Sequence, residues 1–476
     1  MRVEEFDTTE SLLLPEVALL PTGLAREQAV HISDGMFTHV GPATALLKQY
    51  PHLAPIRMDG HLMMPGFIDV HHHLTQSFGK ALAFGEPSEI FRRLWVPLEQ
   101  ALDEESAYLA AKLAALESLR GGFTTVVDAG TRAPIDLAPL ANATSEAGIR
   151  CVLGTVCNDL DENSPTTREI ITRAEEHLRR FEHHRLVHPS LAVSIPEAAS
   201  TDMLRRLSAL AAESGTTFQF HVNEHLAAVE HSLRAHRRRP LEHLYDLGVL
   251  GPQVLAAHAT LLTPSEVRIL ADTASAVAYN PVASAWKGNA VAPAALMAAF
   301  GVRFGLGTDG TRSDAFRLLD AAESAQRLTA GLDSGDSSCG AGWTWIDHAT
   351  IDAAECIGLA GTLGAISVGH AADFLAIDIT VPELQPSYDL TWELVRLTNR
   401  DQITAVVIDG HLRLWRGWPT DWDGPNLVAQ AAKVGQEICA RAPIQRTHPT
   451  AADHRTHHRR GPLPAHDTPA TGKTQP

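Results

Sequence analysis

The sequence predicts an α/β protein, a TIM-like (β/α)8 barrel with a small β-sandwich domain built from both chain ends. In the middle of the chain, eight short apolar segments alternate with helical stretches, which is the repeating unit of such a barrel. These units occupy roughly 250 residues, the usual size of one barrel. Shorter segments that alternate with turn residues lie on both sides of the barrel and indicate the second, β-rich domain.

The β-rich domain is predicted from segments that contain short apolar runs separated by Pro, Gly and Asp. Five segments have this pattern: LLLPEVALL, AVHIS, MFTHVG, GTLGAISVGHAADFLAID (361–378) and ITAVVIDGHLRLWRG (403–417). We expect residues 1–60 and 362–441 to form one composite β-sandwich domain that ends in a helix. Residues 61–361 then form the barrel. Residues 442–476 are predicted to be a disordered tail, because their polar composition cannot offset the entropy of ordering.

The barrel strands are predicted from apolar segments rich in Val, Ile, Leu and Ala, as expected for parallel strands buried on both faces. Their ranges are 66–70, 123–129, 150–156, 191–196, 217–223, 254–259, 276–281 and 303–309. Helices are expected between them, for example over 104–120 and 201–214, where apolar residues recur three and four positions apart.

Composition and charge exclude several classes of protein. The chain has 476 residues and a net charge of −17, which argues against a general binder of nucleic acid or of anionic membranes. Its five cysteines form no CxxC pair, so a disulfide framework is not expected. The first residues do not resemble a secretory signal, and no apolar run reaches the ~18 residues of a membrane span. We therefore expect a cytoplasmic protein.

Histidines at the end of the first barrel strand are the first signal of chemistry. The segment DVHHHLTQ places His71 and His73 two positions apart, so both side chains leave the same face of the strand. His72 then points the opposite way, into the barrel wall. Two imidazoles on one face can chelate a divalent cation, although a surface histidine cluster has the same pattern.

Further polar side chains follow the ends of later strands. His221 and Glu224 lie in HVNE at the end of the fifth strand, His258 ends the sixth, and Asp309 follows the eighth. Each of them alone also fits a structural role, as a core histidine, a helix N-terminal acid or a turn aspartate. Because all of them lie at the carboxyl ends of strands, where a barrel carries its active site, their joint placement favours a metal centre.

The motifs PGFIDVHHHLTQ, HVNE, AHAT, NPVAS and GLGTDG, in this order, resemble the amidohydrolase superfamily. The chain is most similar to the mononuclear-metal branch of cytosine, guanine and S-adenosylhomocysteine deaminases and triazine hydrolases. The resemblance covers roughly residues 10–415. The flanking segments GAISVGHAADFLAIDI and ITAVVIDGHL match the pieces that complete the β-sandwich of the family.

The resemblance implies a role for each of these residues. His71, His73, His221 and Asp309 would bind one catalytic divalent metal ion. Glu224 would shuttle a proton to the substrate, His258 would orient the attacking water or polarise the substrate, and Asp309 would also take a proton from the water. The fourth-strand segment LAVSIP contains no lysine, so a carbamylated lysine that bridges two metals is not expected. Three imidazoles and one carboxylate suit Zn²⁺, with Fe²⁺ as the alternative.

The function predicted from these parts is a hydrolytic deaminase of a small aminated N-heteroaromatic ring. A guanine or other oxopurine, a pterin or a triazine would be attacked by metal-activated water and would release ammonia. The alternatives are a triazine-type chlorohydrolase or a cyclic amide hydrolase on the same site, and, in another class, an inactive barrel used as a binding module. The family also suggests a homodimer or a larger homo-oligomer.

Four residues are predicted to contact the substrate. Gln76 supplies a donor and an acceptor to a lactam-type ring edge, as in guanine-type and triazine relatives, or is a polar rim residue. Trp95 forms an aromatic wall or belongs to the core. Trp286, with Lys287 beside it, faces the pocket from the seventh loop. Glu197 holds an amino or ring N–H group of a guanine-like or pterin-like base.

Two departures from the family pattern bear on the substrate. Nucleoside-directed relatives carry a substrate-binding histidine in the fourth strand, whereas this chain has VSIPEA, with Ser194 and Ile195. The second histidine of the family's sixth-strand segment is also replaced, near Leu261. Both departures argue against adenosine or S-adenosylhomocysteine as the substrate.

Overall fold

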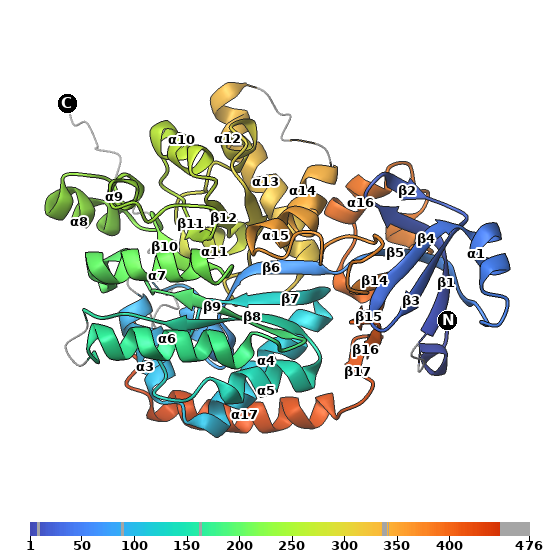
Figure 1. The fold of residues 1–476 in the computed structure, drawn as a ribbon, viewed down its shortest axis with the longest axis horizontal. Coiled ribbons are helices and arrows are strands. Elements are labelled where there is room, and N and C mark those ends of the chain that lie inside the picture. Colours follow the sequence, from blue (N-terminus) through green and yellow to red (C-terminus); the bar gives the residue numbers. More distant parts are fainter. Residues whose placement is uncertain (7–9, 87–89, 161–163, 336–339, 341, 448–476) are drawn as a thin grey trace, which may run out of the picture.

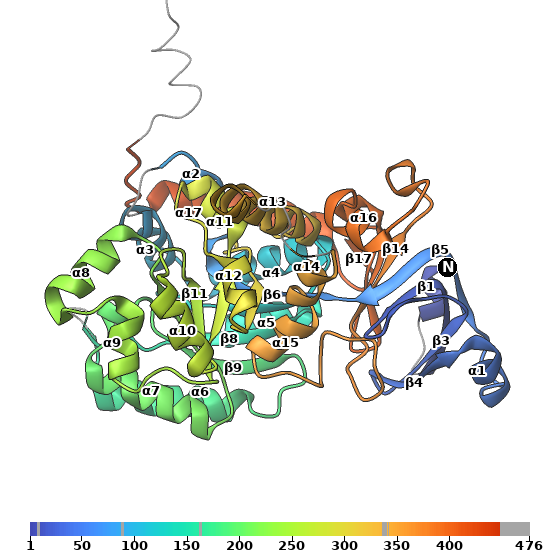
Figure 2. The same ribbon diagram turned by 90° about the horizontal axis from the view of Figure 1, so that it is seen from above.

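The computed structural model describes residues 1–447 except 7–9, 87–89, 161–163, 336–339 and 341; residues 448–476 lie outside the described part. It contains a barrel and a separate mixed sheet, which lie side by side in Figures 1 and 2. The predicted fold class is therefore confirmed.

The barrel is an eight-stranded parallel sheet with the order β13-β12-β11-β10-β9-β8-β7-β6. Its strands are β6 (Phe67–His72), β7 (Phe123–Asp128), β8 (Arg150–Val156), β9 (Val187–Ala192), β10 (Phe218–Val222), β11 (Val254–His258), β12 (Ala276–Tyr279) and β13 (Phe304–Leu306). The two ends of this order lie against each other. Hydrogen bonds from Thr308 N to Asp69 Oδ1 and from Asp309 N to His71 O, both 2.9 Å, join the loop after β13 to β6.

The fourth strand differs from the prediction. The structure places β9 at Val187–Ala192, whereas the apolar run suggested 191–196. His188 and Pro189 hide the true strand in the sequence, because a proline and a polar residue argue against a buried strand. The downstream end of the apolar run instead enters a turn, in which η4 (Pro196–Ala198) forms one short 3-10 helix.

Helices surround the barrel strands, as Figures 1 and 2 show. The structure has α4 at Glu104–Arg120, as predicted, and α7 at Thr201–Glu213, one residue shorter than predicted. Asp103 caps α4 by accepting a 2.9 Å hydrogen bond from Ser106 N. The others are α2 (Lys80–Ala83), α3 (Val96–Gln100), α5 (Ala138–Ala147), α6 (Thr167–Phe181), α8 (Leu226–His236), α9 (Pro240–Asp246), α10 (Pro264–Asp272), α11 (Pro281–Lys287), α12 (Ala294–Ala299), α13 (Ala315–Ser334), α14 (Gly342–His348) and α15 (Ile351–Cys356), with the short 3-10 helix η2 (Leu74–Gln76) and the π-helix η3 (Phe91–Trp95).

The second sheet has nine strands from both ends of the chain, in the order β17-β16-β15-β14-β5-β1-β3-β4, with β2 beside β1. They are β1 (Glu10–Leu20), β2 (Gly23–Ala25), β3 (Gln28–Ser33), β4 (Met36–Pro42), β5 (Ile56–Pro65), β14 (Phe374–Asp378), β15 (Ile403–Ile408), β16 (His411–Trp415) and β17 (Trp418–Pro419). The two chain ends meet where β5 pairs with β14. β5 crosses the expected boundary at residue 60 and leads directly into β6.

The remaining helices lie near the sheet or on the barrel. They are η1 (Val3–Phe6), α1 (Ala43–Gln49), η5 (Pro382–Leu384), α16 (Leu390–Arg396), η6 (Arg400–Gln402) and α17 (Gly424–Arg441). The last helix, α17, lies along α4 of the barrel (Figure 1). No helix of the described residues is both long and apolar enough to cross a membrane.

The start of the predicted disordered tail contacts the barrel. Gln445 N donates to Arg93 O over 2.9 Å, and Thr447 N donates to Glu86 Oε2 over 2.8 Å. These contacts hold the start of the tail against the barrel. The buried Glu86 carboxylate accepts a backbone hydrogen bond there, a partner that the composition of the tail could not reveal. The rest of the predicted tail, 448–476, lies outside the described residues.

Candidate metal centre and active site

The end of β6 presents two histidines to the barrel mouth, as the strand period predicts. The ring centroids of His71 and His73 lie 5.0 Å apart. His72 points the other way, with its Nδ1 atom 3.0 Å from Asp69 Oδ2 and 3.3 Å from Thr308 Oγ1. His72 is thus part of the wall that joins β6 to the loop after β13.

Three polar residues at the ends of later strands have an unusual backbone conformation. Asn223, His258 and Asp309 have φ angles of 53°, 70° and 58°, a left-handed conformation that non-glycine residues rarely adopt. Such strain persists only where the surrounding structure enforces it, and it is typical of functional sites. Here it turns the chain sharply as each strand ends and keeps the His258 and Asp309 side chains at the barrel mouth.

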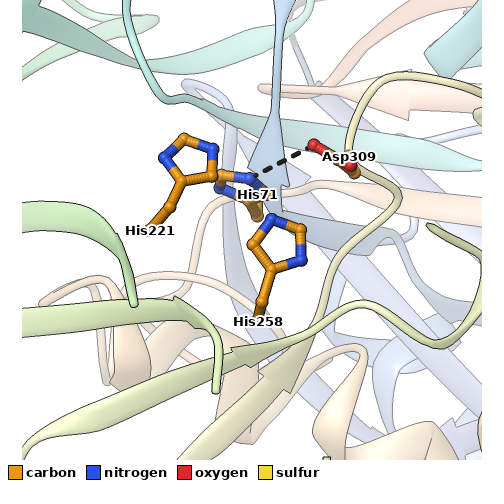
Figure 3. Close-up of side chains that lie close together, drawn as sticks. All are labelled: His71, His221, His258 and Asp309. Carbon is orange, nitrogen blue, oxygen red and sulfur yellow. Dashed lines mark ion pairs between the residues drawn. The ribbon is translucent and has the colours of Figure 1, made fainter. Parts of the chain in front are cut away.

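Four residues from different strand ends converge, as Figure 3 shows. His71, His221, His258 and Asp309 each offer one ligand atom, and these atoms all lie within 4.8 Å of one another. His71 Nε2 is 3.4 Å from Asp309 Oδ1. His73 belongs to the same group, because its Nε2 atom lies 3.2 Å from both Asp309 Oδ1 and His221 Nε2. The structure therefore brings together every residue proposed as a metal ligand.

The protonation of these imidazoles fits a bound cation. Burial lowers the pKa of His73 to about 3 and the pKa of His258 to about 4, and it holds the pKa of His221 well below its usual value. Metal ligands must be neutral imidazoles, and these rings are neutral near pH 7. Within the described residues, His71 Nε2 is buried without a hydrogen-bond partner, a costly arrangement that a cation would relieve.

The hydrogen bonds made by the Nδ1 atoms of two histidines indicate different roles for their Nε2 atoms. His221 Nδ1 donates to Ser194 O over 2.7 Å, so the lone pair of Nε2 faces the centre. Asn280 Nδ2 donates to His258 Nδ1 over 3.2 Å, which leaves the proton of the neutral ring on Nε2. A protonated Nε2 donates a hydrogen bond and does not bind a cation. The chemistry of the donors therefore favours His221 as a ligand and His258 as a hydrogen-bond donor.

A buried carboxylate pair flanks the imidazoles. Glu224 Oε2 lies 3.6 Å from His258 Nε2, and Glu224 Oε1 lies 2.8 Å from Lys287 Nζ. Burial alone would raise the pKa of Glu224, but His258 and Lys287 outweigh it and hold this pKa below its ordinary value. Lys287 Nζ also lies 2.7 Å from Asp309 Oδ2. Sequence reasoning placed Lys287 near the pocket but did not assign it to the centre.

Gln76, predicted to bind the substrate, is held by a buried glutamate in α3. Gln76 Nε2 donates to Glu99 Oε1 over 3.2 Å, and Thr75 Oγ1 donates to the same oxygen over 3.2 Å. Glu99 is fully buried, and its Oε2 atom lies 2.7 Å from Arg132 Nε. A carboxylate only accepts hydrogen bonds, so it fixes the amide of Gln76 with Oε1 as the free atom. Neither Glu99 nor Arg132 was predicted from the sequence. The one signal was Glu99 itself, a charged residue among the apolar residues of a predicted helix.

The three other predicted substrate contacts lie in different surroundings. Trp286 packs edge-on against Phe84, with 5.4 Å between ring centroids, and its Nε1 atom donates to Thr311 Oγ1 over 3.1 Å. Trp95 is 6% exposed and packs in the hydrophobic core of the barrel, the alternative expected for it. Glu197 lies in η4, where burial raises its pKa against the opposing effect of the nearby His231 and His236. The structure does not bring Trp95 or Glu197 to the imidazole group.

Comparison with known proteins defines the class. Residues 62–413 match the amidohydrolase family, and the chain belongs to this family. A 5-methylthioadenosine/S-adenosylhomocysteine deaminase of Syntrophobacter fumaroxidans is 28% identical over 390 residues, which cover 81% of this chain and 87% of that protein. A 5'-deoxyadenosine deaminase of Methanopyrus kandleri is 28% identical over 381 residues, covering 79% of this chain and 86% of that protein.

Solved structures agree on the fold. A zinc-bound adenosine deaminase from Xanthomonas campestris has a TM-score of 0.83 at 24% identity, covering 90% of this chain and 98% of that one. A guanine deaminase from C. acetobutylicum with bound guanine has a TM-score of 0.73 at 18% identity, covering 85% and 99%. The predicted family and the predicted enzyme class, a hydrolase of carbon–nitrogen bonds other than peptide bonds, are confirmed.

Proposed function

We propose that this amidohydrolase is a metal-dependent aminohydrolase that releases ammonia from a small aminated N-heteroaromatic ring. The observation that carries the proposal is the pair of carboxylates, the largely buried Glu224 and the buried Asp309, on either side of an imidazole cluster. One carboxylate lies against His71 and His73, and the other lies against the N–H of His258. Hydrolysis at an amino-bearing carbon needs this division, because one group must take a proton from water while another delivers a proton to the ring.

We propose that His71, His73, His221 and Asp309 hold one divalent cation. Their three imidazoles and one carboxylate suit Zn²⁺, and Fe²⁺ would accept the same donors. A cation bound here would acidify a water molecule and so make it a nucleophile near neutral pH. The zinc in the adenosine deaminase of the same fold supports this assignment.

The protein side chains then move the protons. Asp309 takes one proton of the attacking water, while His258 Nε2–H donates a hydrogen bond that orients this water. This proton passes to Glu224, whose carboxylate is ionised at the start, and Glu224 delivers it to the ring nitrogen next to the amino-bearing carbon. The second proton of the water, which remains on the added hydroxyl group, is then transferred through the same carboxylates to the departing amino group. Ammonia leaves, and the ring keeps a carbonyl in place of the amino group.

Gln76 supports recognition of the ring edge. Since Glu99 holds its Nε2 atom, Gln76 presents Oε1, which accepts a hydrogen bond from a ring N–H. This favours lactam-type rings, the oxopurines and pterins of the prediction. Trp286, next to Lys287, would cover one side of the ring. Glu197 and Trp95 remain predicted contacts for which the geometry offers less support.

A second candidate is an adenosine-derived substrate. It is favoured by the curated relatives, which are named for 5-methylthioadenosine, S-adenosylhomocysteine and 5'-deoxyadenosine. Against it, the segment around Ser194 lacks the histidine of nucleoside-directed relatives, and Ser194 instead uses its carbonyl to orient His221. Displacement of chloride from a triazine, or opening of a cyclic amide, would use the same residues and is distinguished by its product.

The test is a coupled ammonia assay of the zinc-loaded protein against aminopurines, aminopyrimidines, pterins, triazines and adenosine derivatives. We expect ammonia from at least one compound, dependent on metal. The variant Glu224→Gln should keep the metal and lose turnover by a factor of about 10²–10⁴, the usual contribution of a proton-transferring group. Wild-type rates in this variant, or chloride or a carboxylic acid as the only product, would contradict the proposal. A cytoplasmic location, a homo-oligomeric state and the absence of nucleic-acid and membrane partners remain predictions.

A further inference from the structure

Lys287 contacts one oxygen of each site carboxylate, and in both residues it is the oxygen other than the one nearest the imidazole cluster. Asp309 Oδ1 is the oxygen closest to the histidines, 3.4 Å from His71 Nε2 and 3.2 Å from His73 Nε2. The other oxygen, Oδ2, is 2.7 Å from Lys287 Nζ. One carboxylate therefore has an oxygen for the proposed cation and a second oxygen for the ammonium group.

Glu224 repeats this arrangement. Its Oε2 atom is 3.6 Å from His258 Nε2, whereas its Oε1 atom is 2.8 Å from Lys287 Nζ and 3.3 Å from Asn289 Nδ2. The ammonium group thus bridges the outer oxygens of the two residues that are proposed to handle protons. Under the proposed function, the reacting carbon of a substrate would sit beside these two carboxylates and therefore near Lys287.

The position of Lys287 is fixed by its surroundings. Lys287 is the last residue of α11, and its side chain is 11% exposed. Its neighbour Trp286 is anchored by Thr311 and Phe84. Gly288, with a φ of 69°, then ends the helix in the left-handed conformation that glycine adopts without strain. The ammonium group is therefore placed by a helix end that is held on both sides.

One donor of the ammonium group remains for a ligand. An ammonium has three N–H donors, and Glu224 and Asp309 accept two of them. Among the described residues, the third has no acceptor, and the nearest ring, Trp286, lies 5.5 Å from Nζ. A largely buried ammonium group with a free donor favours an acceptor oxygen on the substrate, because a hydrogen bond from a charged donor is stronger than one from a neutral donor.

We propose that Lys287 is a specificity-determining residue that donates its third N–H to an exocyclic oxo oxygen of the substrate ring. The inference rests on the proposed aminohydrolase function and narrows its substrate class. The preferred substrate is an oxo-substituted aminated heterocycle, which offers a ring N–H to Gln76 Oε1 and an oxo oxygen to Lys287. Aminated rings without this oxygen are poorer substrates.

The test uses pairs of compounds that share the amino-bearing carbon and differ in the oxo group. Suitable pairs are guanine with 2-aminopurine, pterin with 2-aminopteridine, and ammeline with 2,4-diamino-1,3,5-triazine; adenosine and 5'-methylthioadenosine complete the panel. The ratio of kcat/KM between the members of a pair is measured for the zinc-loaded wild type and for Lys287→Met, Lys287→Arg and Asn289→Ala. Zinc content and thermal unfolding of each variant are recorded, and calorimetry measures the affinity for the product of each pair.

We expect the wild type to prefer the oxo compound at least tenfold. Lys287→Met should lower this ratio tenfold or more and weaken binding of the oxo product, with zinc content unchanged. Lys287→Arg keeps the charge and should lose less. Asn289→Ala, which removes a neutral donor to the same Glu224 oxygen, should affect both members of a pair alike. If Lys287→Met does not fold, the ratio for Lys287→Arg decides: a ratio equal to that of Asn289→Ala overturns the inference.

The two proposals fail in different ways. If the wild type releases ammonia from no compound, the aminohydrolase function fails and the inference falls with it. If the wild type deaminates adenosine compounds or the oxo-free members equally well or better, or if Lys287→Met keeps the wild-type ratio, the function stands and the role of Lys287 is refuted.

Discussion

Replacing Glu99 should destabilise the fold and weaken substrate binding, because this residue pairs with Arg132 and orients Gln76. Glu99 is fully buried and accepts hydrogen bonds from Thr75 Oγ1, Gln76 Nε2 and Arg132 N, in addition to its contact with Arg132 Nε. The variant Glu99→Gln keeps the shape of the side chain but removes its charge. The new amide contains a donor as well as an acceptor, so it can bind either Nε2 or Oε1 of Gln76. Residue 99 then no longer fixes Oε1 as the atom that faces away from it.

The expected magnitude follows from the burial of the pair. Breaking a buried ion pair by removing one partner costs about 3–5 kcal/mol. We expect the lower end, about 3 kcal/mol, because Arg132 is 11% exposed and stacks over Phe91 at 4.7 Å, and so keeps some stabilisation. If Gln76 also loses its orientation, one hydrogen bond to the substrate is weakened, worth about 1 kcal/mol or about fivefold in KM.

The assay is urea unfolding of the zinc-loaded protein, with KM measured for the best substrate of the panel. The matched control is Thr75→Val, which removes a neutral donor to the same Glu99 oxygen and should cost only about 1 kcal/mol. The reasoning is refuted if Glu99→Gln unfolds at the same urea concentration as Thr75→Val and has the wild-type KM.

Two further predictions concern stability. Burial lowers the pKa of His177 to about 4, and its Nε2 atom hydrogen-bonds Leu153 O over 2.9 Å. In the unfolded chain His177 binds a proton with a pKa of about 6.5, whereas in the folded protein it does so only near pH 4. The free energy of unfolding therefore decreases as the pH falls from about 6.5 to about 4, by at most about 3 kcal/mol. His177→Gln should flatten this part of a denaturation-against-pH curve, and an unchanged slope would contradict the assignment. Arg150 forms a bidentate pair with Asp373 across the junction of barrel and mixed sheet, with 3.1 and 3.2 Å contacts at 5% and 4% exposure. Asp373→Asn should cost about 3 kcal/mol in chemical denaturation, whereas a cost below about 1 kcal/mol would show that the pair is not needed.

Much of the site could be predicted from two general rules, the two-residue period of a strand and the topology of a barrel. His71 and His73 share a face through the two-residue period of a strand, and every barrel strand ends at the same rim. Asp309 was ambiguous as a single residue, since an aspartate in a Gly-Thr-Asp-Gly turn is usually structural. The histidines at the same rim favoured a role in the site, and in the structure Asp309 Oδ1 lies 3.2 Å from His73 Nε2.

Other parts depend on contacts between distant segments, which no local pattern encodes. Lys287 reaches the centre only because α11 ends where it does, and Glu99 in α3 pairs with Arg132 in the loop after β7. β9 was displaced in the prediction because Pro189 lies within a true strand. Trp95 has an amphipathic neighbourhood that fits a pocket wall and a core equally well; it packs in the hydrophobic core, and its contact with a substrate stays a prediction.

The central claim is that His71, His73, His221 and Asp309 hold a single ion. Elemental analysis of the purified protein, dialysed against metal-free buffer after zinc loading, tests it most directly. We predict one zinc per chain in the wild type and in Glu224→Gln, and much less than one in His221→Ala and Asp309→Asn. A wild type that retains no metal, or ligand variants that retain a full equivalent, would contradict the claim.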